Sequence, residues 1–137
     1  MQILVIDGQG GGVGRALVER LKGEFPDSTI TALGTNVLAT TAMLKAGADH
    51  AATGENAIIY NAPMADIILG PIGILSANSM LGELSPGMAA AVGASRAVKI
   101  LLPVGKCKVR VAGAQDVTLA MAIDAAVGMV KECRGGL

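Results

Sequence analysis

A glycine-rich turn between an apolar strand and an amphipathic helix is the feature that most constrains how this chain folds. Residues 2–7 (QILVID) form an apolar run rich in Ile and Val, which is typical of a buried parallel strand. Residues 8–14 (GQGGGVG) follow, and apolar side chains recur at helical spacing after Arg15. A strand, a glycine-rich turn and a helix in this order predict the opening of an α/β fold whose turn faces a ligand.

The remaining segments continue this alternation. We expect strands at 29–33, 48–53, 65–69 and 97–102, and helices at 15–25, 37–46, 72–81, 86–94 and 117–133. Asn36, Ser85 and Asp116 are predicted to be helix N-caps. Residues 55–61 fit either a helical turn or an extended segment. Residues 108–111 (KVRV) alternate after a turn too short for a parallel crossover, which predicts an antiparallel edge strand.

These elements predict a single domain over residues 1–137. Its length is enough for one hydrophobic core. Strands alternating with helices predict a Rossmann-like three-layer α/β sandwich, with a mostly parallel sheet and an antiparallel edge strand. Such a sheet binds ligands at the carboxyl ends of its strands.

Composition excludes several functional classes. Eleven basic residues balance eleven acidic ones and aromatic residues are only 1% of the chain, so we expect no nucleic-acid partner. The two cysteines and the single His50 lack metal-ligand spacing, so no metal site is predicted. No uninterrupted apolar stretch is long enough to cross a membrane, and no signal peptide opens the chain. The sequence therefore predicts a cytoplasmic protein with no membrane partner.

The predicted ligand site gathers residues from several strand ends. A phosphate is expected on Gly10–Gly14, because glycine backbone and a helix N-terminus suit an anion. The candidate binding residues are Asp7, Gly8, Gln9, Gly10, Gly11, Gly12, Val13, Gly14, Thr35, Asn36, Glu55, Asn56, Gly70, Pro71 and Gly73. No catalytic residues are predicted.

The loop resembles the cofactor loop of short-chain dehydrogenases/reductases, because Gly8, Gly12 and Gly14 have the G-x-x-x-G-x-G spacing. The resemblance covers only about the first 25 residues. That family's Y-x-x-x-K is absent, since Met64 stands four residues after Tyr60. The second strand also ends without the acid or Arg that selects a ribose or a 2′-phosphate. A reductase of this family is therefore disfavoured, while NAD(P) or another nucleotide stays the expected cofactor class.

A P-loop is rejected on three residues. Gln9, Arg15 and Ala16 stand where G-x-x-x-x-G-K-[ST] requires Gly, Lys and Ser or Thr. Without that hydroxyl the loop offers no ligand to Mg²⁺.

Several residues have two interpretations. The glycines either bind a ligand or only permit close packing of strand and helix. Asp7 either caps the turn or holds a sugar hydroxyl. Glu55 is a general base, a ribose ligand or an ordinary first-turn acid, and Cys107 fits a surface thiol better than a nucleophile. The methionines between residues 64 and 95 form either an apolar subunit interface or ordinary core.

Five runs along the chain resemble one family. They are IDGQGGGVG, ALGTN, MLKAGAD, ATGENAI and IILGPIGI. The resemblance spans nearly the full length and is to a domain-of-unknown-function family of short bacterial proteins, largely from anaerobes. It implies a single-domain Rossmann-like protein and carries no assigned activity.

The sequence thus favours a small Rossmann-like protein that binds a nucleotide, a dinucleotide or a phosphorylated metabolite at the Gly8–Gly14 loop. The first alternative is a non-catalytic interaction or sensor module, a homo-oligomer in which the glycine loop is structural. The second is an NAD(P)-dependent redox enzyme whose catalytic groups come from the substrate or a partner.

Overall fold

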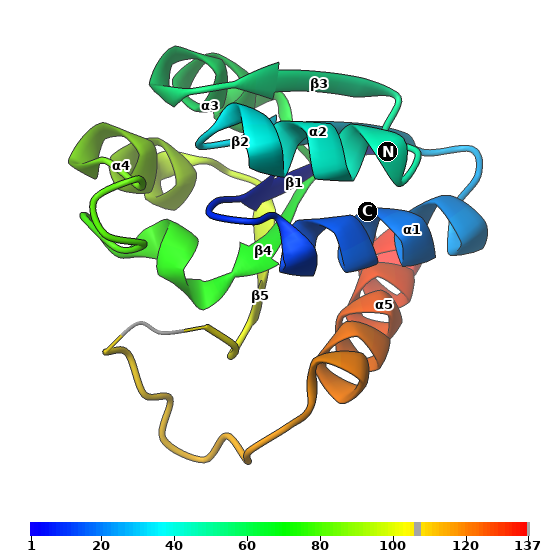
Figure 1. Cartoon of the computed structure of the whole chain (residues 1–137). Helices are drawn as coiled ribbons and strands as arrows, with labels where there is room; N and C mark the ends of the chain where they lie inside the picture. The colour runs from blue at the N-terminus through cyan, green and yellow to red at the C-terminus, as the bar shows by residue number, and fades with distance from the viewer. Residues whose placement is uncertain (106–107, 137) are drawn as a thin grey trace.

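Five strands form one sheet in the order β3-β2-β1-β4-β5 (Figure 1). The structure is a computed structural model that describes residues 1–105 and 108–136. The strands are β1 (Gln2–Asp7), β2 (Thr29–Gly34), β3 (His50–Thr53), β4 (Ile67–Pro71) and β5 (Val98–Leu102). All four neighbouring pairs are parallel. Because the chain moves outward in one direction to β3 and then returns to β4, the strand order reverses between β1 and β4, where such sheets bind ligands.

Helices cover both faces of the sheet, which confirms the predicted α/β sandwich (Figure 1). One face carries α1 (Gly12–Glu24), α2 (Val37–Lys45) and α5 (Leu119–Gly136). The other carries α3 (Glu55–Asn61) and α4 (Pro86–Ala94), with the short 3₁₀ turns η1 (Ala62–Met64) and η2 (Ile72–Leu75). Within the described residues, no helix has both the length and the apolar character needed to cross a membrane.

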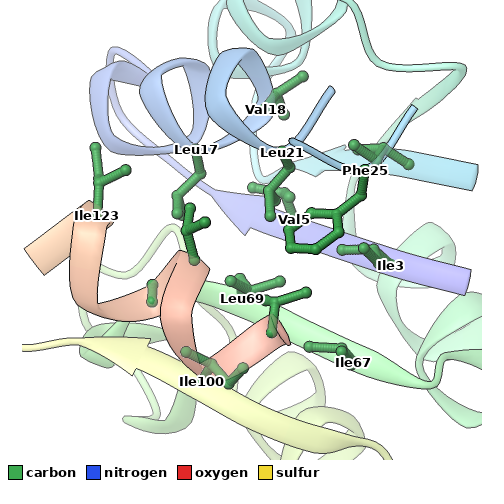
Figure 2. Packing of buried hydrophobic residues seen from close by; sticks show 14 of the residues in the cluster. Ile3, Val5, Leu17, Val18, Leu21, Phe25, Ile67, Leu69, Ile100 and Ile123 are labelled. Carbon is green, nitrogen blue, oxygen red and sulfur yellow. The ribbon is translucent and has the colours of Figure 1, made fainter. Parts of the chain in front are cut away.

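Alternate side chains of the central strands form two apolar cores. Ile3 and Val5 of β1 pack beneath α1 and α5, while Leu4 and Ile6 face α3 and α4. Figure 2 shows the first core, in which Leu17 and Leu21 of α1 lie over β1. The continuous apolar runs of β1 and β4 are therefore explained by burial on both faces of a parallel sheet.

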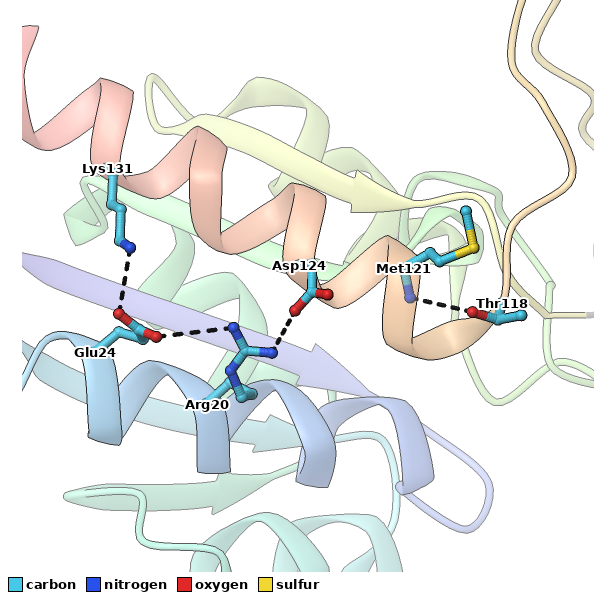
Figure 3. A network of polar contacts seen from close by, with 6 residues as sticks. All are labelled: Arg20, Glu24, Thr118, Met121, Asp124 and Lys131. Atoms are coloured by element: carbon cyan, nitrogen blue, oxygen red, sulfur yellow. Dashed lines mark hydrogen bonds and ion pairs between the residues drawn. The ribbon is translucent and has the colours of Figure 1, made fainter.

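Ion pairs also link α1 and α5 along their exposed sides (Figure 3). Arg20 Nη1 lies 2.6 Å from Asp124 Oδ1, and Lys131 Nζ lies 3.3 Å from Glu24 Oε2. These side chains are largely exposed, so solvent screening keeps their contribution to stability small. The buried face of α5, with Ile123, Val127 and Val130, anchors the helix instead.

The predicted antiparallel edge strand is wrong. Among the described residues the sheet is wholly parallel, and residues 108–111 form no strand. Val109 and Val111 are 45% and 50% exposed, so the alternation buries neither face of the segment. The chain instead uses this stretch to pass from β5 to α5, which packs beside α1. Lys106 and Cys107 lie outside the described residues, so the interpretation of Cys107 stays a prediction.

The predicted helix at 72–81 is also wrong beyond Leu75, where η2 ends. Residues 76–84 form successive turns, and Asn78, Met80 and Leu81 have φ of 65°, 58° and 57°. A right-handed helix cannot continue through these left-handed conformations.

Two of the three predicted N-caps are confirmed. Asn36 Oδ1 accepts from the Ala39 amide at 2.9 Å, and Ser85 Oγ accepts from the Met88 amide at 3.1 Å. The cap of α5 is Thr118, whose Oγ1 accepts from the Met121 amide at 3.2 Å (Figure 3). Asp116 lies too far ahead of Leu119 to take that role.

Candidate functional site

A cavity of about 600 Å³ lies where the strand order reverses, at the carboxyl ends of β1 and β4. The glycine loop, the end of β4, the 76–84 turns and the segment after β5 form its walls. The lining residues are Asp7, Gly8, Gln9, Gly10, Gly11, Gly12, Val13, Pro71, Gly73, Ser79, Met80, Leu81, Val104 and Gly105. A cavity of this size suits a small-molecule ligand.

Three glycines of the loop have structural reasons to be glycine. A Cβ at Gly8 would lie 2.6 Å from Met80 Sδ, and one at Gly14 would lie 2.9 Å from the Cβ of Asp7. Gly11 has a φ of 73°, and a Cβ there would lie 2.7 Å from the Cα of Ala39. Close packing and backbone conformation therefore account for these three positions.

Gly10 and Gly12 have no such reason. A Cβ at either position meets nothing within 4 Å, and neither has a positive φ. Both residues are exposed and both line the cavity. Their missing side chains leave open space directly in front of the first turn of α1.

The backbone amides at this point are also free. The Gly11 amide donates to the carbonyl oxygen of Gly8 at 2.9 Å. Among the described residues, the amides of Gly10 and Gly12 donate to no acceptor. Free amides at a helix N-terminus, together with the positive end of the helix dipole, make an environment that favours an anion.

Asp7 caps the turn, which is one of its two predicted roles. Its Oδ1 accepts from the Gly8 amide at 2.8 Å and its Oδ2 accepts from the Gly14 amide at 2.7 Å. The side chain is buried, and burial raises the pKa of the Asp7 carboxyl above its ordinary value of 3.8, although the two amides oppose the shift. The nearby Glu83 carboxylate raises this pKa further. Because the amides occupy both oxygens, Asp7 holds the loop in shape.

Replacing Asp7 with asparagine is expected to change how stability depends on pH. The folded protein retains the Asp7 proton to a higher pH than the unfolded chain does. The contribution of Asp7 to the free energy of unfolding therefore decreases as the pH rises from 3.8 through the higher pKa of the folded state. An asparagine side chain does not titrate. Urea unfolding from about pH 3 to about pH 8 should therefore show the wild type losing stability relative to the variant as pH rises. A difference that stays constant with pH would contradict this assignment.

Glu83 is the main residue that sequence reasoning missed. Its Oε1 accepts from the Gln9 amide at 2.9 Å, the Thr35 hydroxyl at 2.8 Å and the Asn36 side-chain amide at 2.7 Å. The Gln9 amide, followed by the Thr35 hydroxyl, lowers the pKa of the Glu83 carboxyl. Glu83 is 48 positions from Thr35 in sequence, and no motif connects the two. Glu83 therefore places a carboxylate beside the end of β2, although residues 32–36 at that end include no acidic residue.

The structure brings together most, though not all, of the predicted site residues. Pro71 and Gly73 line the cavity with residues 7–13, whereas Gly14 does not line it. Thr35 and Asn36 are not lining residues, but both donate hydrogen bonds to Glu83, which also accepts from the Gln9 amide of the loop. Gly70 lies behind Pro71, where β4 passes close to Ile6. Neither Glu55 nor Asn56 is among the lining residues.

Glu55 takes part in packing between helices. Its Oε2 accepts a hydrogen bond from the Ser85 hydroxyl, which caps α4. A Cβ on Gly87 would lie 3.2 Å from the same carboxylate. Glu55 therefore ties α3 to the start of α4.

Among the described residues, the charged side chains at and beside the cavity are those of Asp7 and Glu83, and both are acidic. No Lys or Arg from the described part of the chain is among its lining residues. Arg15 points along α1, with its Nη1 3.9 Å from Glu19 Oε2. Within the part of the chain that the structure describes, an anion at the loop would therefore be bound mainly by backbone amides.

The methionines divide between core and surface. Met88 is 4% exposed and belongs to the second core. Met80, in the 76–84 turns, packs against this core. Met64 is 54% exposed. Two of the three thus serve packing, and a subunit interface stays a prediction.

Comparisons with known proteins identify one family. The profile of the family described as Domain of unknown function (DUF3842) matches residues 2–134. None of the curated proteins matches this sequence. Among solved structures, the chain is similar to a dodecameric FMN-dependent Ubix-like decarboxylase from Escherichia coli O157:H7, with a TM-score of 0.47 and 15% identity. That match covers 100% of this chain and 96% of the decarboxylase chain.

Proposed function

This chain belongs to the DUF3842 family of unknown function, and we propose that it binds a small phosphorylated ligand, in the first instance a nucleotide, at the glycine loop. One observation carries the proposal. Gly10 and Gly12 line the cavity, need to be glycine for neither packing nor conformation, and leave two amides free. A phosphate oxygen is the kind of acceptor that such amides bind at a helix N-terminus.

The rest of the cavity supports a ligand with an apolar part. Met80, Leu81 and Val104 contribute apolar walls beside the loop. Flat, weakly polar groups such as a nucleobase pack against side chains of this kind. The Glu83 carboxylate beside β2 disfavours a further phosphate at that end, so NAD⁺ and mononucleotides fit the proposal better than NADPH.

The proposal is tested by a thermal-shift titration with NAD⁺, NADPH, ATP, ADP, FMN and inorganic phosphate. A ligand at 100 times its Kd stabilises a protein by about 2.7 kcal/mol, which raises its Tm by several degrees. Gly12→Asp is expected to weaken binding by about 100-fold or more, because it places a like charge where the phosphate would lie. The variant should fold normally, since position 12 has open space and an acidic residue suits the first turn of a helix.

Two matched variants separate charge from size and position. Gly12→Ala adds a small side chain without charge, and Gly128→Asp adds the same charge on the exposed side of α5. Gly128→Asp should bind as the wild type does, and Gly12→Ala should fall between wild type and Gly12→Asp. An unchanged ligand shift in folded Gly12→Asp would refute the proposed site. No shift with any ligand would favour the non-catalytic interaction module.

A further inference from the structure

Residues 76–84 form a self-contained strap that supplies one wall of the cavity. Its backbone is bonded mostly to itself: the Asn78 amide donates to the Leu84 carbonyl oxygen at 2.7 Å, and the Leu84 amide donates to the Ser79 carbonyl oxygen at 3.2 Å. Leu84 is fully buried at one end, whereas Leu81 at the tip is 98% exposed. The strap is therefore anchored at its base and largely surrounded by solvent at its tip.

The strap touches the glycine loop through few side chains. A Cβ on Gly8 would lie 2.6 Å from Met80 Sδ, so this methionine lies against the loop. Glu83 supplies the polar contact, since one carboxylate oxygen accepts from Gln9, Thr35 and Asn36. These donors belong to the segments after β1 and β2, so a single side chain joins the strap to two loops at the cavity.

The backbone of the closed strap is strained. Asn78, Met80 and Leu81 all have left-handed φ, a conformation that costs free energy for residues with a Cβ. Leu81 gains no burial in return. Such strain persists only where surrounding contacts offset it, and the Glu83 hydrogen bonds are the charge-assisted contacts available for this.

We propose that the strap of residues 76–84 opens and closes over the cavity, and that Glu83 is the latch that holds it closed. Opening separates Met80 from Gly8 and releases the Gln9 amide and the Thr35 and Asn36 side chains. Ligands then gain access to the loop as Met80 leaves its place against the second core, while Leu84 at the base of the strap stays buried. Glu83 is accordingly a positioning residue. The latch is independent of the identity of any ligand.

Limited proteolysis with chymotrypsin tests the latch without a ligand. A protease binds its substrate as an extended segment, so cleavage after Met80 or Leu81 requires the turns of the strap to unfold locally even though Leu81 is exposed. Mass spectrometry identifies these sites. Glu83→Ala removes the acceptor and is expected to speed strap cleavage by about tenfold or more, because a single hydrogen bond to a charged group is worth that factor. Glu83→Gln keeps a neutral acceptor oxygen and should give an intermediate rate.

A double-mutant cycle with Thr35→Val separates a latch from a general structural role. If the two residues act through one hydrogen-bonded unit, Thr35→Val should speed strap cleavage in the wild type and have little further effect in Glu83→Ala. Glu19→Ala, an exposed acid on α1, should leave strap cleavage unchanged.

Three results would overturn the latch. They are strap cleavage within about twofold of wild type in Glu83→Ala, additive effects in the cycle, and equal acceleration at every cleavage site. The last would mean that Glu83 supports the fold as a whole. The test of the latch is independent of the test of the proposed function. If no ligand binds, the cleavage rates still show whether Glu83 holds the strap closed. If Glu83 does not hold the strap, the proposed ligand binding at Gly12 is unaffected.

Discussion

Replacing Gly70 with alanine is expected to destabilise the protein by about 3 kcal/mol or more. Gly70 lies in β4, in the middle of the sheet, and a Cβ there would overlap the carbonyl oxygen of Ile6 in β1. That oxygen belongs to the backbone of the central strand, so it cannot move aside as a flexible side chain would. Relief requires β1 and β4 to separate, which weakens their hydrogen bonds and the packing of both cores.

Thermal and urea unfolding would measure this effect, with an expected fall in Tm of roughly 10 °C. Gly10→Ala is the matched control, because its Cβ meets nothing within 4 Å and its φ is not positive. The control should be neutral or should stabilise the protein by up to about 1 kcal/mol, since alanine restricts the unfolded chain. Equal stability of the two variants would show that β1 and β4 do not approach as closely as the structure has them.

The sequence predicted the fold well wherever local pattern and tertiary packing agree. The apolar runs of β1 and β4 are buried on both faces, so they are recognisable without any partner. Asn36 and Ser85 precede helices and cap them through backbone amides three residues away in sequence. Interactions of this range depend on local sequence, which is why they could be inferred from it.

The prediction failed where distant contacts override local preference. Residues 76–81 (SANSML) were predicted to be helical, yet three of them take left-handed conformations. Glu83, in the same turns, accepts hydrogen bonds from the distant residues Gln9, Thr35 and Asn36. The predicted antiparallel strand at 108–111 was wrong for a similar reason, because this segment leads away from the sheet edge to α5, which packs on α1. Its two valines are exposed, so pairing with the sheet is not favoured by burial of an apolar face.

The candidate site was only partly visible in the sequence. A parallel sheet binds ligands at the carboxyl ends of its strands, so Gly10, Gly12 and Pro71 could be inferred without knowing the strand order. Glu83 reaches the site from a strap whose course the sequence did not reveal. Glu55 looked like a site residue because it follows β3, but β3 is an edge strand, separated from the β1–β4 crevice by β2.

Replacing Phe25 with alanine is expected to cost about 4 kcal/mol of stability while leaving ligand affinity unchanged in the folded protein. Phe25 is 2% exposed at the end of α1, and Figure 2 shows it beside Ile3, at the amino end of β1. The glycine loop follows the opposite end of that strand, so the cavity left by the lost ring lies away from the ligand site. Urea unfolding would measure the loss.

Phe25→Leu is the control for this variant, because it keeps most of the buried volume and should cost less than about 1.5 kcal/mol. Arg134→Gln tests the other contact of the ring, whose centroid lies 5.9 Å from the Arg134 guanidinium carbon, and should cost less than about 1 kcal/mol. Ligand titration below the Tm of each variant completes the test. The two variants should have opposite effects: Phe25→Ala should lower stability without changing affinity, and Gly12→Asp should lower affinity without changing stability. If Phe25→Ala reduced affinity as strongly as stability, the loop would depend on the packing at the far end of α1, and its glycines would be part of the architecture.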